Sequence, residues 1–73
     1  MHEHNYHSDI RRLELGLPYL LKHNKEHVKD IEKWLKRAKT AGYNDIAQDL
    51  ERVIELSQEI TKCFESALRK LKR

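Results

Sequence analysis

The stretch that decides the fold lies near the middle of the chain, at residues 35–50, Leu-Lys-Arg-Ala-Lys-Thr-Ala-Gly-Tyr-Asn-Asp-Ile-Ala-Gln-Asp-Leu. Gly42 can adopt the left-handed conformation that ends a helix, and Asn44 is a favourable N-cap for a second helix. A connection this short forces the helices on either side of it to run antiparallel. The stretch therefore predicts a helical hairpin.

Apolar residues recur every three or four positions on both sides of this turn, as they do along one face of a helix. We expect a first helix over residues 17–41, with an inner face of Leu17, Leu21, Asn24, Val28, Ile31, Leu35 and Ala38. We expect a second helix over residues 45–70, with inner-face positions Ile46, Leu50, Val53, Ser57, Ile60, Phe64, Ala67 and Leu71. Asn24 is a polar residue within this contact, a position that often sets the register of two helices.

The N-terminal part of the chain is expected to be organised differently. Residues 1–8 are poor in apolar side chains and predict a flexible, His-rich tail. A short helix is expected over residues 9–15, because Gly16 and Pro18 then interrupt the helical pattern. Residues 9–73 would form one all-α helical hairpin domain.

Composition narrows the class of protein. The chain has 73 residues, of which 37% are charged, and a net charge of +3. No apolar run approaches the roughly 18 to 20 residues that span a bilayer, so we expect a cytoplasmic protein without membrane insertion. Nucleic-acid binding is not expected, because binding motifs and interleaved aromatic residues are absent. No nucleophile and base are paired, so catalysis is not expected, and the single cysteine, Cys63, is interpreted as a small buried side chain.

Each predicted helix carries a second apolar flank beside its inner face. The first helix adds Leu20, His27 and Trp34, and the second adds Ala47, Ile54, Thr61 and Leu68. Two helices cannot cover these flanks, so either the short N-terminal helix packs on them or two hairpins form a four-helix bundle. We favour the homodimer, with Leu20, Trp34, Ile54 and Leu68 as interface residues.

The five histidines cluster within the first 27 residues, and they are His2, His4, His7, His23 and His27. Histidine is the commonest protein ligand for transition metals, and an i, i+4 pair places two imidazoles on one face of a helix. If the chain folds back at Gly16, His7 reaches the level of His23 and His27; if it continues straight, the tail and the pair are about 20 Å apart and cannot share an ion. Asn24 and Asp30 are candidates for the second shell around such a site. The alternative is structural, with His27 half-buried in an interface and His23 simply exposed.

One longer pattern resembles an uncharacterised family of small helical proteins of bacteria and archaea. The pattern is Leu17-Pro18-Tyr19, then His23-Asn24-Lys25-Glu26-His27, then Trp34, Ala38, Ala41-Gly42 and Ile46-Ala47. These proteins have a His-rich N-terminus, a Leu-Pro-aromatic start and an Ala-Gly turn, and the likeness covers nearly the whole chain. The resemblance implies a hairpin and the handling of nickel, cobalt or zinc. The tail here is shorter and has fewer histidines than is typical of that family, which favours binding or sensing over storage.

Two functions follow as hypotheses. The first is a protein that binds Ni²⁺, Co²⁺ or Zn²⁺ through His23 and His27, with tail histidines completing the coordination. Imidazole must be neutral to bind a metal, so affinity should fall below about pH 6.5. The second is a helical module for protein–protein interaction or dimerisation in which the histidines are incidental.

Overall fold

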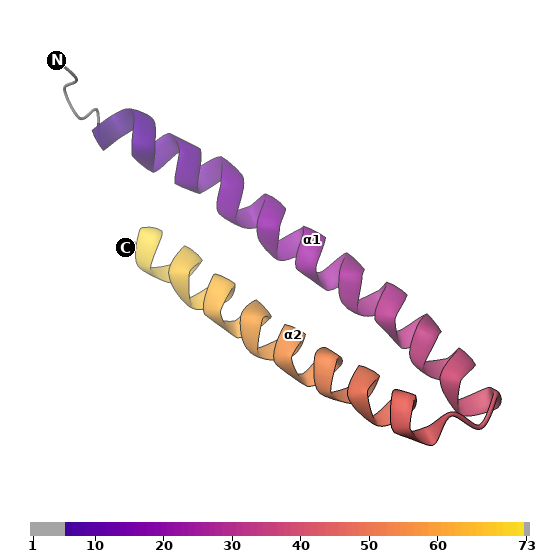
Figure 1. The fold of residues 1–73 in the computed structure, drawn as a ribbon. Helices are drawn as coiled ribbons and strands as arrows, with labels where there is room; N and C mark the ends of the chain where they lie inside the picture. The colour runs from indigo at the N-terminus through magenta and orange to yellow at the C-terminus, as the bar shows by residue number, and fades with distance from the viewer. Residues whose placement is uncertain (1–5, 73) are drawn as a thin grey trace, which may run out of the picture.

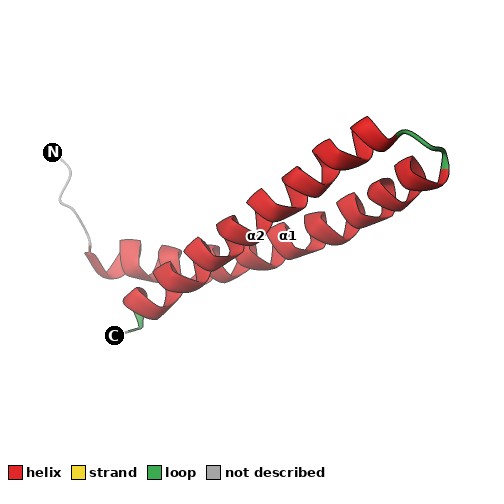
Figure 2. Cartoon of the chain, turned by 90° about the horizontal axis from the view of Figure 1, so that it is seen from below, coloured by secondary structure: helices red, strands yellow, loops and turns green. Residues whose placement is uncertain are grey.

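The computed structural model of the chain describes the backbone of residues 6–72 and the side chains of residues 8–72. It contains helix α1, Tyr6–Thr40, and helix α2, Asn44–Leu71, packed side by side in opposite directions (Figure 1). Seen from below, the two helices cross at a shallow angle (Figure 2). No strand occurs in the described residues. The predicted all-α helical hairpin is confirmed.

The turn between the helices forms as the sequence predicts. Gly42 has a φ of +84°, the left-handed conformation that a side chain disfavours. The N–H of Tyr43 donates to the carbonyl of Ala38 at 3.0 Å, and the N–H of Gly42 donates to that of Lys39 at 3.1 Å. These two bonds make a Schellman ending, which satisfies the last carbonyls of α1. Asn44 is the first residue of α2 rather than its cap, and the cap position belongs to Tyr43.

The N-terminal part of α1 differs from the prediction. A separate short helix over residues 9–15 was expected, but α1 runs without a break through Gly16 and Pro18. Pro18 removes one backbone hydrogen bond, and Gly16 costs about 1 kcal/mol relative to alanine. We attribute the continuity to Leu17 and Leu21, which are half-buried and keep this part of α1 on the hairpin. Residues 6–8, assigned to the tail, are also helical, and residues 1–5 lie outside the described residues.

The inner face of α1 is the predicted one, and that of α2 is shifted by one residue along half of its length. All seven predicted positions of α1 are half-buried. On α2, the predicted Ile46, Val53 and Ile60 are exposed, and their C-terminal neighbours take their places. The observed inner face of α2 consists of Ala47, Leu50, Ile54, Ser57, Thr61, Phe64, Ala67, Leu68 and Leu71.

This shift corrects two of the interface residues expected from the sequence. Ile54 and Leu68 are half-buried on the face of α2 that contacts α1, so they do not form part of a separate surface for another chain. Leu20 and Trp34 are exposed, as an interface with another chain requires. The physical reason is the inner-face polar contact, because Thr61 on the shifted face hydrogen-bonds with Asn24 of α1.

The hairpin is a single thin layer with very little interior. Its Cα atoms extend over 58 × 26 × 16 Å. Among the described side chains only Ala47 and Ser57 are buried, and no large side chain is fully buried. No helix in the described part of the chain has the length and apolarity needed to cross a membrane. Two helices in one layer cannot enclose a core, so much of the apolar surface stays open to solvent.

Candidate functional site

Two histidines of α1 form the strongest candidate for a binding site. His23 and His27 are one turn apart on the same side of the helix, and both side chains are exposed. Their Nε2 atoms lie 3.0 Å apart, and their rings meet edge to face with centroids 4.5 Å apart. When both rings are neutral, one Nε2 carries a proton and the other accepts it in a hydrogen bond.

The distance between these nitrogen atoms matches the spacing of two neighbouring ligands of one metal ion. Histidine binds Zn²⁺ at about 2.0 to 2.1 Å. Two nitrogens at that distance are about 3.0 Å apart for a bond angle of 90° and about 3.4 Å apart for a tetrahedral angle. The two Nε2 atoms are therefore spaced as two neighbouring ligands of one ion would be.

Tyr19 extends the pair by one more turn of the helix. Its ring stacks on that of His23 at an interplanar angle of 9°, with centroids 5.8 Å apart. Tyr19, His23 and His27 thus form a ladder with a spacing of four residues, a pattern that the sequence itself contains. The stack restricts the orientation of the His23 ring, which limits the entropy lost when a ligand binds.

The pair alone does not make a complete metal site. Within the described residues, no group of three or more His, Cys, Asp or Glu side chains is placed to hold a metal ion. His7 lies in the first turn of α1, 16 positions before His23, and a continuous helix puts it roughly 24 Å away along the axis. Of the two alternatives for the chain at Gly16, the structure has the straight continuation, so His7 does not reach the pair within one chain. His2 and His4 lie outside the described residues.

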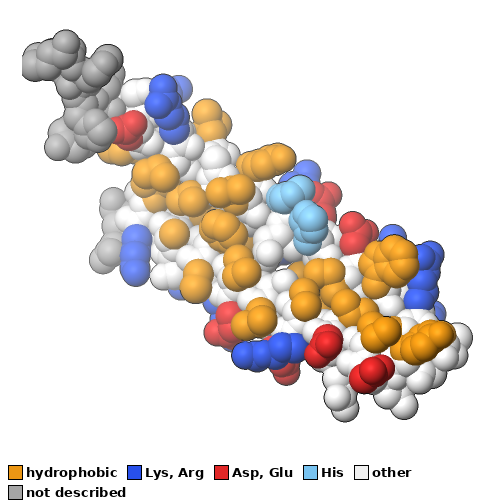
Figure 3. Space-filling model, viewed as in Figure 1, with side chains coloured by type: hydrophobic (Ala, Val, Ile, Leu, Met, Phe, Trp, Pro, Cys, Tyr) orange, Lys and Arg blue, Asp and Glu red, His pale blue; other side chains and the backbone are white. Residues whose placement is uncertain are grey.

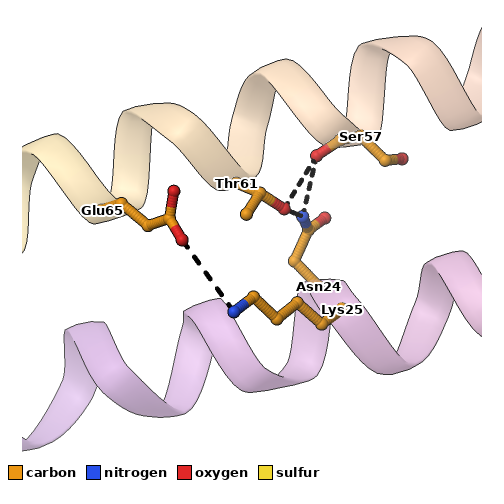
Figure 4. A network of polar contacts seen from close by, with 5 residues as sticks. All are labelled: Asn24, Lys25, Ser57, Thr61 and Glu65. Carbon is orange, nitrogen blue, oxygen red and sulfur yellow. Dashed lines mark hydrogen bonds and ion pairs between the residues drawn. The ribbon is translucent and has the colours of Figure 1, made fainter.

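Asn24 belongs to the contact between the helices. Its amide nitrogen Nδ2 donates to the Ser57 carbonyl at 3.0 Å and to Oγ1 of Thr61 at 2.8 Å (Figure 4). The Thr61 hydroxyl also donates to the Ser57 carbonyl at 3.1 Å. Asn24 thus joins α1 to α2 through a backbone carbonyl and a hydroxyl. Asp30, the other residue expected around the site, is exposed one turn beyond the pair.

The histidine pair lies on an apolar face that covers both helices. In Figure 3 the histidine side chains lie on α1 at the edge of this face, with hydrophobic groups to either side along the helix and charged side chains on their outer side. The large exposed members of this apolar face are Leu13, Leu20, Trp34, Ile46, Val53, Leu56 and Ile60, with exposed fractions of 40 to 58%. A shallow groove within it is lined by Leu17, Leu56, Glu59, Ile60, Cys63, Phe64 and Ala67. Cys63, expected to be buried, is exposed there.

The opposite flank of the hairpin is polar. Lys39 pairs with Glu51 at 3.4 Å, and Lys25 approaches Glu65 at 3.9 Å, in both cases from α1 to α2. All four side chains are about half exposed, so each pair contributes at most about 1 kcal/mol. The hairpin therefore has one polar and one apolar side.

These features define a class of small two-helix protein with one polar and one apolar flank. A family model described as a domain of unknown function (DUF8180) matches residues 13–71. The chain therefore belongs to this family. No curated protein and no solved structure shows a significant match.

Proposed function

We propose that this protein binds a divalent transition metal ion, Ni²⁺, Co²⁺ or Zn²⁺, through His23 and His27, and that it is not an enzyme. The observation that carries the proposal is the 3.0 Å separation of the two Nε2 atoms. Imidazole nitrogen is a good ligand for all three ions, whereas Mg²⁺ and Ca²⁺ prefer oxygen ligands. Further ligands must come from water, from the tail or from another chain.

Calorimetric titration of the metal-free protein with Ni²⁺ tests the proposal. We expect saturable binding to the wild-type chain and its loss in the His23→Ala/His27→Ala variant. A His2→Ala/His4→Ala/His7→Ala variant is the matched control, because it removes the tail imidazoles and leaves the helical pair in place. Binding that survives the helical variant and disappears in the tail variant would contradict the proposal.

The apolar face supports a second function, that of an interaction module. Leu20, Trp34, Val53, Leu56 and Ile60 are all at least 40% exposed, and they lie on the two helices of the hairpin. A surface of this kind packs against other helices. Sedimentation of the metal-free protein tests this function, because self-association that persists without metal would separate it from metal binding.

A further inference from the structure

We infer that a second copy of this chain completes the metal site. Two hairpins pack through their apolar faces in antiparallel orientation, and the twofold axis passes between His23 and His27. The inference rests on the proposed metal-binding function and adds the source of the missing ligands. One ion would then be held by four imidazoles, two from each copy.

The apolar face has the size of a stable dimer interface. The part of α1 that packs on α2 is about 40 Å long, and two adjacent helices are about 20 Å wide, which gives a footprint of about 800 Å² on each copy. A typical specific interface buries about that area per partner. Since no large described side chain is fully buried in the single chain, a second layer would supply the core that one hairpin lacks.

The position of the axis follows from the register of the two helices. Asn24 contacts both Ser57 and Thr61, so positions of α1 and α2 whose numbers add up to about 83 lie at the same height. The last residue of α2, Leu71, is then level with residue 12, and the paired part of α1 covers residues 12–40. Its middle is residue 26, within one residue of the midpoint between His23 and His27. Two antiparallel hairpins that overlap fully therefore place their histidine pairs together.

The residues that would meet across α1 fit one another. With the axis at residue 25, positions whose numbers add up to 50 lie opposite each other. His23 then lies beside the partner's His27, and Trp34 lies over the partner's Gly16. Trp34 is 58% exposed, and there is open space around Gly16, where an added Cβ would meet nothing within 4 Å. The largest side chain of the apolar face thus meets the smallest.

The same axis matches the aliphatic residues of α2 with one another. The axis crosses α2 at residue 58, so Leu56 lies beside the partner's Ile60, and Val53 lies beside the partner's Cys63. In addition, the end of α1 that projects beyond α2 would lie along the partner's turn, where Tyr43 is 59% exposed (Figure 1). Both copies would cover their exposed aliphatic residues with similar residues.

The other twofold arrangement, with both turns at the same end, fits less well. There α1 faces the partner's α2 at equal height, which sets Trp34 against the partner's Asp49. Each histidine would then face an aliphatic side chain. The antiparallel arrangement is favoured because it alone brings the two histidine pairs together and sets Trp34 over a glycine.

Two cysteine variants separate the arrangements, because each uses the native Cys63 as its partner. In the antiparallel dimer, Val53→Cys lies beside the partner's Cys63 and should form a covalent dimer on mild oxidation. Leu20→Cys lies beside the partner's Cys63 only when both turns are at the same end. The wild-type chain is the control. In the antiparallel dimer its two Cys63 thiols would be about 15 Å apart along the direction of the helices.

Titration of the metal-free wild-type protein with Ni²⁺, with sedimentation of the same samples, completes the test. We expect covalent dimers from Val53→Cys alone and one ion for every two chains. Covalent dimers from Leu20→Cys, a monomer, or one ion for every chain would overturn the shared site and leave metal binding by the helical pair in place. Covalent dimers from Val53→Cys without saturable Ni²⁺ binding would refute the proposed function instead, and the shared site with it.

Discussion

Asn24 is the polar residue on the otherwise apolar inner face of α1, and its amide makes two hydrogen bonds to α2. Replacing it with alanine removes both bonds and leaves a gap between the helices. We expect Asn24→Ala to lower the free energy of unfolding by about 1 to 2 kcal/mol, measured by urea denaturation at a fixed protein concentration.

The partner of Asn24 provides the control for this experiment. If the hydrogen bond to Thr61 carries part of the loss, Asn24→Ala and Thr61→Val should together cost less than the sum of the two single changes. Strictly additive losses, or an Asn24→Ala variant as stable as the wild type, would contradict the role given to this bond.

Tyr19 affects the site through the orientation of the His23 ring. Tyr19→Ala removes the stacked ring, so His23 samples more conformations before the ion binds. We expect a Ni²⁺ affinity several-fold weaker by calorimetry, with unchanged helix content by circular dichroism. Leu15→Ala is the matched control, because Leu15 is 77% exposed one turn before Tyr19 and makes no described contact with the pair. Equal losses in both variants would rule out a specific effect of the stack.

At the scale of the elements, α1 tolerates a proline in its interior. The proline ring cannot donate to the carbonyl of Glu14, four residues earlier, and an interior proline costs about 3 kcal/mol relative to alanine. We expect Pro18→Ala to slow amide hydrogen exchange in residues 10–17 by up to about 100-fold, since 1.4 kcal/mol is a factor of ten. Lys22→Ala, on an exposed position one turn later, should leave the exchange of this segment unchanged. If hydrogen exchange is unchanged in Pro18→Ala, Pro18 does not destabilise this part of α1, and the expected cost of the proline is contradicted.

The faces of the two helices show how far sequence reasoning reaches. The inner face of α1 followed from the three-and-four spacing because its second row, Leu20, His27 and Trp34, is shorter and is interrupted by a histidine. On α2 two rows flank Leu50, Ser57 and Phe64, and periodicity does not distinguish which of them faces α1. The row containing Thr61 faces α1, because the Thr61 hydroxyl accepts a hydrogen bond from Asn24. The small side chains of Ala47 and Ser57 also allow the two helices to come close. The more apolar row, with Val53 and Ile60, is left on the outer apolar face.

The candidate site was predicted in part for a similar reason. The i, i+4 spacing identified His23 and His27, and the structure brings their nitrogens together. The part assigned to His7 depended on a break at Gly16, which the continuity of α1 removes. Residue spacing along one helix predicts contacts within that helix well. Contacts between different segments of the chain are harder to predict, because they depend on the balance of helix propensity against packing.

At the scale of the whole molecule, the stability of the hairpin should depend on covering its apolar face. Ile60→Glu places a carboxylate in the centre of that face, where burial against another copy would leave the charge unpaired. We expect this variant to sediment as a monomer and to lose helix content, because the single chain has no large side chain fully buried among those described.

Gln58→Glu introduces the same charge two residues away on the polar flank, near Lys25 and Lys29. It should retain the association state and the helix content of the wild type. If Ile60→Glu associates as the wild type does, the apolar face is not the contact between copies.

The most direct measurement of the central claim is the nitrogen NMR spectrum of the histidine side chains, recorded while Zn²⁺ is added to the metal-free protein. Zn²⁺ is diamagnetic, so the ring nitrogens of each histidine remain observable as the ion binds. We predict that the Nε2 resonances of His23 and His27 shift together and saturate, whereas those of His2, His4 and His7 change little. Shifts confined to the tail histidines, or no saturable shift at His23 and His27, would contradict the claim that this helical pair is the metal-binding site.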